Sequence, residues 1–238
     1  MIEIKDKKIV IVGASSGIGR ELAKICAGKG AIIYLVSRTE SKLLELQQEL
    51  GEKSFVQPMD MLDETAVNET FRQIGEFDYM ALTAVADETK LFSPIKSMPT
   101  EIAHRGMEKF WGTFNCCRAA ANYISKEGAM VLTSSIAIYK PSKNASIMNA
   151  ASAAVGVFAK ALALEIAPTR VSVVAPGVVG TGVWTQEETE NYKEWAKKTL
   201  PVEHLGTPQE LAYAYYSILT NPYMTGSITN VDGGLTLI

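Results

Sequence analysis

The sequence has no excess of basic residues and few histidines. Its 238 residues include 23 Lys and Arg against 26 Asp and Glu, which gives a formal net charge of -3. A chain of this balance lacks the positive charge that holds a nucleic-acid backbone, so we expect no nucleic-acid partner. The two histidines, His104 and His204, have no second ligand at the spacing of a metal site. We therefore expect no bound metal and assign both histidines to structural roles.

Cysteine is also scarce. The chain has three, Cys26 and the neighbours Cys116 and Cys117, and their spacing does not suggest a metal site. Neighbouring side chains on a helix point in different directions, so the adjacent pair is not placed to bind one ion. We interpret all three as reduced, buried thiols and expect a cytoplasmic protein.

Long apolar runs are missing as well. The N-terminal stretch MIEIKDKKIVIVGASSG has an apolar run of five residues before its glycines, which is shorter than the apolar region of a secretory signal. Elsewhere no run approaches the roughly 18 apolar residues of a membrane-spanning helix. The sequence therefore predicts neither a secretory signal nor a membrane partner.

What the sequence does contain is a regular alternation of two kinds of segment. Short β-branched runs such as KIVIVGA and IIYLVS alternate with helical stretches such as IGRELAKICAGKG, which predicts parallel strands joined by helices. We expect seven strands, the last at SITNVDGG, and long helices around residues 107–125 and 145–167. No long linker rich in Pro, Gly or Ser divides residues 1–238, so we predict one α/β domain.

The segment 180–207 interrupts this alternation. It is polar, carries Trp184 and Trp195, and follows the end of a predicted strand. Ligands of open α/β sheets bind at the carboxyl ends of strands, so this segment is a candidate substrate lid. The alternative is a solvated helical excursion without a role in binding.

Glycines between the first strand and the first helix form a phosphate-binding motif. In VGASSGIG, Gly13, Gly17 and Gly19 permit a tight turn and a close approach of the backbone. Free N–H groups at a helix N-terminus attract a pyrophosphate, and Ser15 and Ser16 add hydroxyl donors. The position between a strand and a helix makes such a motif specific, so we predict a dinucleotide cofactor.

The end of the second strand indicates which dinucleotide binds. About 20 residues after the glycines, NAD enzymes have a carboxylate for the ribose hydroxyls, whereas this chain reads Val36, Ser37, Arg38 and Thr39. A guanidinium suits a 2'-phosphate, so we expect NADP(H) rather than NAD(H). The alternative is that Arg38 is a solvated loop residue.

Together, the glycine spacing, the strand–helix alternation and the chain length resemble the short-chain dehydrogenase/reductase family, as do PMD, APGVVGT and the closing YMTGSITNVDGG. The resemblance covers nearly the whole chain and implies a doubly wound Rossmann sheet of strand order 3-2-1-4-5-6-7 and a homodimer or homotetramer. With the motifs above, it implies cofactor contacts at a defined set of residues, with Asp60 and Met61 beside the adenine and the last four at the nicotinamide end. The set is Gly13, Ser15, Ser16, Gly17, Ile18, Gly19, Ser37, Arg38, Asp60, Met61, Thr83, Ala84, Val85, Pro176, Gly177, Val179 and Thr181.

The chain departs from the family pattern at the catalytic positions. Ser135, in VLTSS, matches the catalytic serine. Counted from Ser135, and with ALALEIAP downstream as a check, the family's Tyr and Lys fall on Met148 and Ser152. Lys109 stands where the family has a catalytic Asn, and Val85 where it has a glycine beside the cofactor. Losing a positioned acid typically costs about 10² to 10⁴ in rate, so the family's usual mechanism would be slow in this chain. We therefore expect a mechanism that does not use the Tyr and Lys pair.

Other residues near Ser135 are candidates for the missing proton source. Tyr139, Lys140 and Lys143 follow it on the predicted strand-to-helix loop, and Lys109 lies on the preceding helix. A lysine desolvated among apolar groups can act as an acid or base near neutral pH. The alternative is that Tyr139 packs at the rim and the lysines are solvated. Our catalytic candidates are Ser135, Lys109 and Tyr139.

Three functions are compatible with these residues. The first is an atypical NADPH-dependent reductase of a small carbonyl or a conjugated enone. An enone needs no Tyr, because its charge develops on a remote oxygen that Ser135 or a lysine can stabilise while water supplies the proton. The second is a catalytically silent NADPH-binding sensor or partner subunit, with an intact phosphate end and a dismantled catalytic end. The third is a non-redox reaction, which would leave Arg38 and the glycines without a role.

Overall fold

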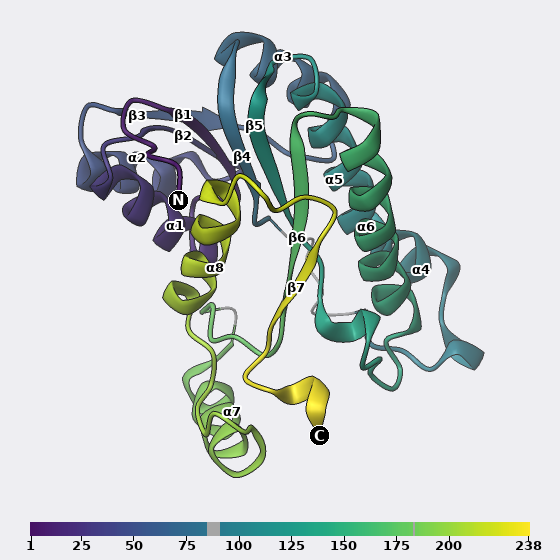
Figure 1. Ribbon diagram of the computed structural model, residues 1–238. Helices are drawn as coiled ribbons and strands as arrows, with labels where there is room; N and C mark the ends of the chain where they lie inside the picture. The colour runs from purple at the N-terminus through teal and green to yellow at the C-terminus, as the bar shows by residue number, and fades with distance from the viewer. Residues whose placement is uncertain (85–90, 183) are drawn as a thin grey trace.

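Seven parallel strands form one sheet in the order β3-β2-β1-β4-β5-β6-β7. The computed structural model describes residues 1–84, 91–182 and 184–238. The predicted Rossmann topology and strand order are confirmed, and the order reverses between β1 and β4 (Figure 1). The strands are β1 (Lys8–Val12), β2 (Ile32–Ser37), β3 (Ser54–Pro58), β4 (Phe77–Leu82), β5 (Ile124–Thr133), β6 (Arg170–Pro176) and β7 (Ile228–Val231).

Helices cover both faces of this sheet. α1, α2 and α8 contribute to the core on one face, and α3, α5 and α6 contribute to the core on the other. The helices are α1 (Gly17–Gly28), α2 (Glu40–Leu50), α3 (Glu64–Ile74), α4 (Thr100–Gly106), α5 (Glu108–Ala120), α6 (Ser146–Glu165), α7 (Gln186–Thr199) and α8 (Pro208–Thr220).

β1 shows why a central strand reads as a continuous apolar run. Ile9 and Ile11 point into the core on the α1 face, and Val10 and Val12 point into the core on the α3 face. A strand covered by helices on both sides has no polar face, so its sequence does not alternate. Full burial of each such side chain contributes about 1.5–3 kcal/mol to folding.

Arg170, at the start of β6, joins this strand to the end of α8. Its buried guanidinium donates hydrogen bonds to the carbonyl oxygens of Ile218 (3.1 Å), Leu219 (2.7 Å), Asn221 (2.8 Å) and Met224 (3.3 Å). Burial lowers the pKa of Arg170. The carbonyl groups at a helix C-terminus carry partial negative charge, so they compensate the buried cation.

The helix predicted around residues 107–125 is wrong in extent. The helix is interrupted at Met107, which ends α4 and precedes α5. α5 stops early because β5 already begins at Ile124, which pairs with Phe77 of β4. That pairing joins segments far apart in the sequence, so local helical periodicity does not reveal it.

α6 has a high mean hydropathy although it contains no long uninterrupted apolar run. Among the described helices, it is the one that is long and apolar enough to cross a membrane, with a mean hydropathy of 1.6, which corrects the expectation that no stretch qualifies. Scattered polar residues break up its apolar runs, and Ser152, Val155 and Ala159 are buried on its inner face against the sheet and α5. Its outer face leaves Val157 and Leu164 exposed.

Candidate functional site

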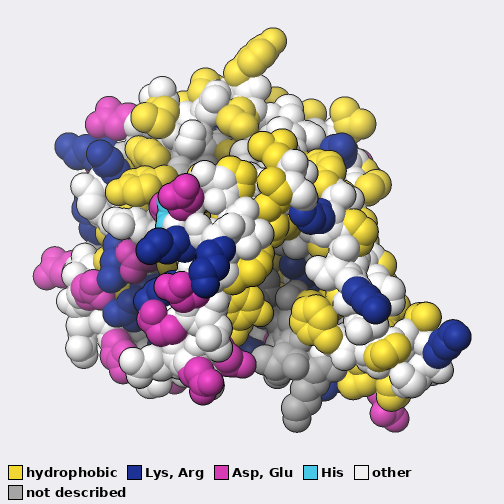
Figure 2. All heavy atoms as spheres, turned by 90° about the horizontal axis from the view of Figure 1, so that it is seen from below, with side chains coloured by type: hydrophobic (Ala, Val, Ile, Leu, Met, Phe, Trp, Pro, Cys, Tyr) yellow, Lys and Arg dark blue, Asp and Glu magenta, His cyan; other side chains and the backbone are white. Residues whose placement is uncertain are grey.

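The carboxyl ends of the strands meet at one edge of the molecule. Figure 2 shows this edge from below, with side chains of both charges over α7 and a hollow beside them. Gly13 N donates to Val36 O (2.7 Å), and Thr83 N donates to Val12 O (2.8 Å). These bonds join the loops after β1, β2 and β4 where the strand order reverses, which is where open α/β sheets bind ligands.

The glycine loop lies too close to β4 for side chains. A Cβ added to Gly13, whose φ is +97°, would lie 2.4 Å from Ala84 N, and a Cβ on Gly19 would lie 2.4 Å from Thr83 Oγ1. Only glycine therefore fits at either position without a shift of the backbone. Val85, the next residue predicted to contact the cofactor, lies outside the described residues.

The N-terminus of α1 fits an anion. Ser16 is its N-cap, with an extended backbone, and no side-chain capping bond is made by Ser16 in the described structure. The first turn contains Gly17, Ile18 and Gly19 and has no acidic residue. Backbone N–H groups at such an end carry partial positive charge and bind phosphate. The Ser15 and Ser16 hydroxyl groups stand directly before them in the chain.

Ser37 and Arg38, at the end of β2, fit a phosphorylated ribose. Ser37 Oγ is buried, and no hydrogen bond to it is found within the described part of the chain, although buried hydroxyl groups are nearly always paired. Arg38 follows it and is exposed. A hydroxyl group without a partner beside an exposed guanidinium matches a 2'-phosphate, which accepts several hydrogen bonds.

The predicted adenine residues have structural roles as well. Asp60 Oδ1 accepts a hydrogen bond from Leu62 N (3.0 Å) in the turn that leads to α3. Met61 is buried, and a Cβ added to Gly112 of α5 would lie 2.6 Å from its Cγ. The side chain of Met61 therefore packs against α5, and its contact with an adenine stays a prediction.

The loop after β6 returns to the glycine loop. A Cβ added to Gly17 would lie 3.3 Å from Thr181 Cβ, so these distant residues of the sequence are neighbours. Pro176 ends β6, and a Cβ on the next residue, Gly177, would lie 2.7 Å from Asp232 Cα. Two predicted parts of the cofactor site, the phosphate loop and the nicotinamide end, are thus brought together by the fold.

Asp232 holds the turn behind Gly177. Its carboxylate accepts hydrogen bonds from Gly234 N (3.0 Å), Thr236 N (2.8 Å) and Thr236 Oγ1 (2.7 Å). Partial burial acts to raise the pKa of Asp232, but the hydrogen bonds from Thr236 and Gly234 outweigh it and the pKa is lowered. Asp232 is therefore a structural anion rather than a proton donor.

Ser135 is placed to donate a hydrogen bond. It follows β5 and precedes a short helix (Ile136–Ile138), and its Oγ accepts a hydrogen bond from Ala137 N (3.1 Å). A hydroxyl that accepts from the backbone keeps its own proton for another acceptor. Ser135 is half-buried at the carboxyl edge, so it can serve a substrate oxygen there.

Lys109 is buried close to Ser135. It lies in the first turn of α5, its side chain is only 5% exposed, and its Nζ donates to Ser134 O (3.1 Å). The alternative that this lysine is solvated is therefore wrong. The fold brings its ammonium group to the carbonyl that directly precedes Ser135.

The other candidate proton donors lie at the surface. Tyr139 is 54% exposed. Lys140 Nζ donates to Leu235 O (3.0 Å) and to Ile238 O at the C-terminus, and Lys143 is exposed. Among the described candidates other than Ser135, Lys109 is the one buried at this edge.

Ser134 connects the two helices behind the site and was not singled out from the sequence. Its carbonyl accepts from Lys109, and its Oγ donates to Ser152 O of α6 (2.7 Å). Ser152 is buried, and Met148 lies one turn earlier on α6. The position of Ser134 directly before Ser135 in VLTSS is the only signal the sequence offers for it.

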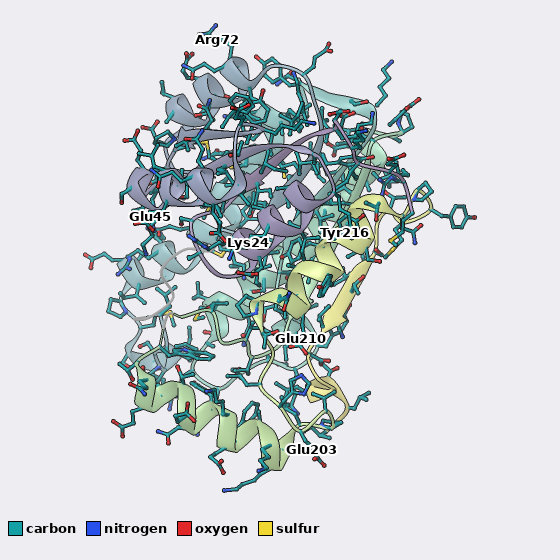
Figure 3. The ribbon with its side chains drawn as sticks, turned by 90° about the vertical axis from the view of Figure 1, so that its left-hand side faces the viewer. Lys24, Glu45, Arg72, Glu203, Glu210 and Tyr216 are labelled. Atoms are coloured by element: carbon teal, nitrogen blue, oxygen red, sulfur yellow. The ribbon has the colours of Figure 1, made fainter. Side chains whose placement is uncertain are left out.

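The candidate lid has a small apolar core of its own. The rings of Trp184 and Tyr192 stack at 4.3 Å, and Val179 pairs with Gly206 at the base of the segment. Figure 3 shows Glu210 at the start of α8 and Glu203 in the loop before it. A hydrogen bond of 2.8 Å joins His204 Nε2 of this loop to Glu210 Oε1, so the lid segment is connected to α8.

The remaining tryptophan and the cysteines are not among the candidate site residues. Trp111 is 55% exposed on α5, so it is not part of the hydrophobic core. The three cysteines are free and buried, and burial raises the pKa of Cys26 and Cys116 to about 12. In residues 1–84, 91–182 and 184–238, no group of three His, Cys, Asp or Glu side chains is placed to hold a metal ion.

Comparison with known proteins finds relatives that match nearly the whole chain. A family model described as Enoyl-(Acyl carrier protein) reductase matches residues 13–236. Carbonyl reductase family member 4 of Danio rerio is 32% identical, over 96% of this chain and 98% of the relative. The 3-oxoacyl-[acyl-carrier-protein] reductase of Homo sapiens is 29% identical, over 98% of this chain and 99% of the relative.

Solved structures show the same fold. A short-chain dehydrogenase/reductase from Brucella melitensis superposes with a TM-score of 0.89 at 24% identity, over 98% of each chain. A small-chain dehydrogenase in complex with NADPH superposes with a TM-score of 0.78 at 27% identity, over 98% of this chain and 100% of that chain.

Proposed function

Because this chain belongs to the short-chain dehydrogenase/reductase family, we propose that it is an NADPH-dependent reductase of a small carbonyl compound or a conjugated enone. The observation that carries the proposal is that Ser37 and Arg38 are adjacent residues at the end of β2. A buried hydroxyl without a partner in the described structure lies next to an exposed guanidinium. A 2'-phosphate would satisfy both groups.

The preference for NADPH over NADH follows from charge. The end of β2 has no carboxylate to accept hydrogen bonds from ribose hydroxyls, and Arg38 offers a positive charge instead. Two solved structures at 25% identity or above, the small-chain dehydrogenase and an L-sorbose reductase from Gluconobacter frateurii, are described as complexes with NADPH. Both observations support the proposal.

The proposed chemistry depends on Ser135. When bound, the nicotinamide supplies a hydride to the substrate. With a carbonyl substrate, Ser135 Oγ would donate a hydrogen bond to the oxygen that takes up the electron pair of the C=O bond, and Lys109 or water would supply the proton that completes the alcohol. In an enone the hydride adds to the far carbon of the double bond, and the same hydrogen bond stabilises the enolate until water protonates it.

The mechanism proposed here does without the family's Tyr and Lys. α6 carries Met148 and Ser152 at the corresponding positions, and neither side chain delivers a proton to an alkoxide near neutral pH. Of the candidate proton sources, Lys109 is buried, with Nζ 3.1 Å from Ser134 O, whereas Tyr139 lies at the surface. The names of the relatives refer to a carbonyl group and to a 3-oxoacyl group, which supports a carbonyl substrate.

A fluorescence titration tests the cofactor. Energy transfer from tryptophan to the reduced nicotinamide is followed with NADPH and, separately, with NADH. We expect micromolar binding of NADPH and much weaker binding of NADH, followed by NADPH oxidation with a ketone, an enone or a 3-oxoacyl thioester. If neither cofactor binds, the reductase proposal is wrong.

A second function is favoured by one observation. The N-terminal half of α6, from Ser146 to Val155, carries no titratable side chain at the place where the family has its acid. A catalytically silent NADPH-binding sensor or partner subunit would have such a helix. It would bind NADPH without turnover on any substrate, and the substitution Ser135→Ala would leave its function unchanged.

A further inference from the structure

Two threonines close the carboxyl edge of the sheet in the same way. Thr83, directly after β4, donates a hydrogen bond from Oγ1 to the carbonyl oxygen of Val12, the last residue of β1 (3.0 Å). Thr133, the last residue of β5, donates from Oγ1 to the carbonyl oxygen of Leu82, the last residue of β4 (2.6 Å). Each hydroxyl group therefore joins two neighbouring strands at their ends, and the two bonds together connect β1, β4 and β5.

Tyr215 of α8 holds the second of these threonines. A hydrogen bond joins the hydroxyl oxygen of Tyr215 to Thr133 Oγ1. Because the proton of Thr133 is used in its bond to Leu82 O, Tyr215 is the donor. Tyr215 is completely buried, and burial raises the pKa of its hydroxyl group, which therefore keeps its proton. The result is a buried chain of hydrogen bonds from Tyr215 through Thr133 to Leu82.

This chain of bonds ends beside both halves of the proposed site. Leu82 directly precedes Thr83, which is predicted to contact the cofactor, and Thr133 lies two residues before Ser135. A phenylalanine would fill the same apolar space as Tyr215 without burying a hydroxyl group, which costs free energy unless it is paired. The hydroxyl group therefore contributes orientation rather than packing, since it fixes the direction in which the Thr133 side chain points.

We propose that Tyr215 is a positioning residue: acting through Thr133, it holds the end of β5 against the end of β4 and so fixes where Ser135 stands relative to the nicotinamide. The inference rests on the proposed reduction by NADPH, and it adds a residue of α8 to the site. A displacement of about 1 Å between reacting groups can cost about 10²-fold in rate. The phosphates bind at the loop after β1, so their affinity does not depend on this contact.

The variant Tyr215→Phe removes the hydroxyl group and keeps the ring. NADPH oxidation is measured with phenanthrenequinone, a diketone, as the probe substrate. We expect kcat to fall about tenfold, while the Kd of NADPH changes by less than about twofold. Tyr213→Phe makes the same chemical change at an exposed site of the same helix, so it is the matched control and should leave kcat unchanged.

A second measurement needs no substrate. Amide hydrogen exchange reports how firmly each segment of the chain is held. We expect faster exchange in residues 134–140 of Tyr215→Phe and unchanged exchange in the glycine loop, residues 13–19. Ile218→Val removes a methyl group from a buried position on α8 and leaves the bond between Tyr215 and Thr133 in place. Any increase in its exchange should therefore be spread over the chain.

Thr133→Val tests whether the two hydroxyl groups act as one unit. It removes the acceptor of Tyr215 and the donor to Leu82, so the loss in kcat should be at least as large as in Tyr215→Phe. In the double variant the two losses should not add, because Tyr215 has already lost its acceptor. Additive losses would overturn the proposed chain of bonds.

The outcomes separate this inference from the function on which it rests. If the wild type binds no NADPH, the proposed function fails, and exchange in residues 134–140 alone decides whether Tyr215 places Ser135. If the wild type oxidises NADPH and a folded Tyr215→Phe keeps its kcat and its exchange, the reductase proposal stands and the role of Tyr215 is overturned. An equal fall in kcat in Ile218→Val overturns it as well, because the loss would then follow stability. Thermal unfolding identifies which variants are folded.

Discussion

Gly19 of α1 lies directly against the backbone of Gly13, and a Cβ on Gly19 would be 2.3 Å from the Gly13 carbonyl oxygen. The substitution Gly19→Ala therefore forces the loop and the helix apart. We expect a loss of about 1–3 kcal/mol in the free energy of unfolding and a clear loss of NADPH affinity. Urea unfolding and calorimetry measure the two effects.

Gly28→Ala is the matched control in the same helix. Nothing among the described residues lies within 4 Å of a Cβ built there, and alanine favours helix by up to about 1 kcal/mol. Stability should be unchanged or slightly raised. Equal losses in both variants would show that the contact with Gly13 does not limit residue 19.

Arg38→Asp should reverse the cofactor preference. The carboxylate repels a 2'-phosphate and accepts hydrogen bonds from the ribose hydroxyls of NADH. We expect NADPH affinity to fall by about tenfold or more and NADH affinity to rise, both measured by fluorescence titration. Lys126→Asp, which makes the same charge change at an exposed site in β5, should leave the preference as it is.

Arg170→Met should destabilise the fold without touching the cofactor site. The variant leaves the carbonyls at the end of α8 without their buried donor, and we expect a loss of about 2–4 kcal/mol. Chemical denaturation measures it. Arg118→Met removes an exposed ion pair with Glu64 (2.7 Å), so its loss should stay below about 1 kcal/mol. Similar losses in both would contradict the role of Arg170.

His204 makes the base of the candidate lid sensitive to pH. The hydrogen bond to Glu210 raises the pKa of His204 above its usual value, helped by Val202 O. A raised folded-state pKa gives stability that is fully present below about pH 6.5 and is lost as pH rises through the folded-state pKa. Thermal unfolding of the wild type and of His204→Gln should therefore differ more at low pH than at high pH. A difference independent of pH would contradict this coupling.

We propose that the exposed outer face of α6 forms the contact between subunits in the homodimer or homotetramer that the family resemblance leads us to expect. Val157 and Leu164 are 69% and 82% exposed, and Trp111 is exposed on α5, the helix that packs against α6. A symmetric contact between two copies would bury this face twice. Light scattering should show an oligomer that Val157→Lys/Leu164→Lys reduces to monomers, whereas Leu44→Lys on α2 should not. A wild-type monomer would refute the expectation.

Local sequence patterns were sufficient for the sheet and for the phosphate end of the site. β-branched runs such as Ile9–Val12 favour strands buried on both faces, and their alternation with helices leaves few topologies. The glycine loop is equally local, because Gly13, Gly17 and Gly19 act through their own backbone and through the helix end that follows them.

The arrangement around Ser135 was decided by the tertiary structure. Lys109, Ser134 and Ser152 come from three elements, and only the packing of α5 and α6 against the end of β5 joins them through Ser134. The sequence by itself determined the Rossmann sheet and its strand order, whereas the absence of the family's usual acid stays a prediction. The burial of Lys109 and the exposure of Trp111 depend on contacts between segments that are distant in the sequence. The energies of such contacts cannot be read from a local sequence pattern.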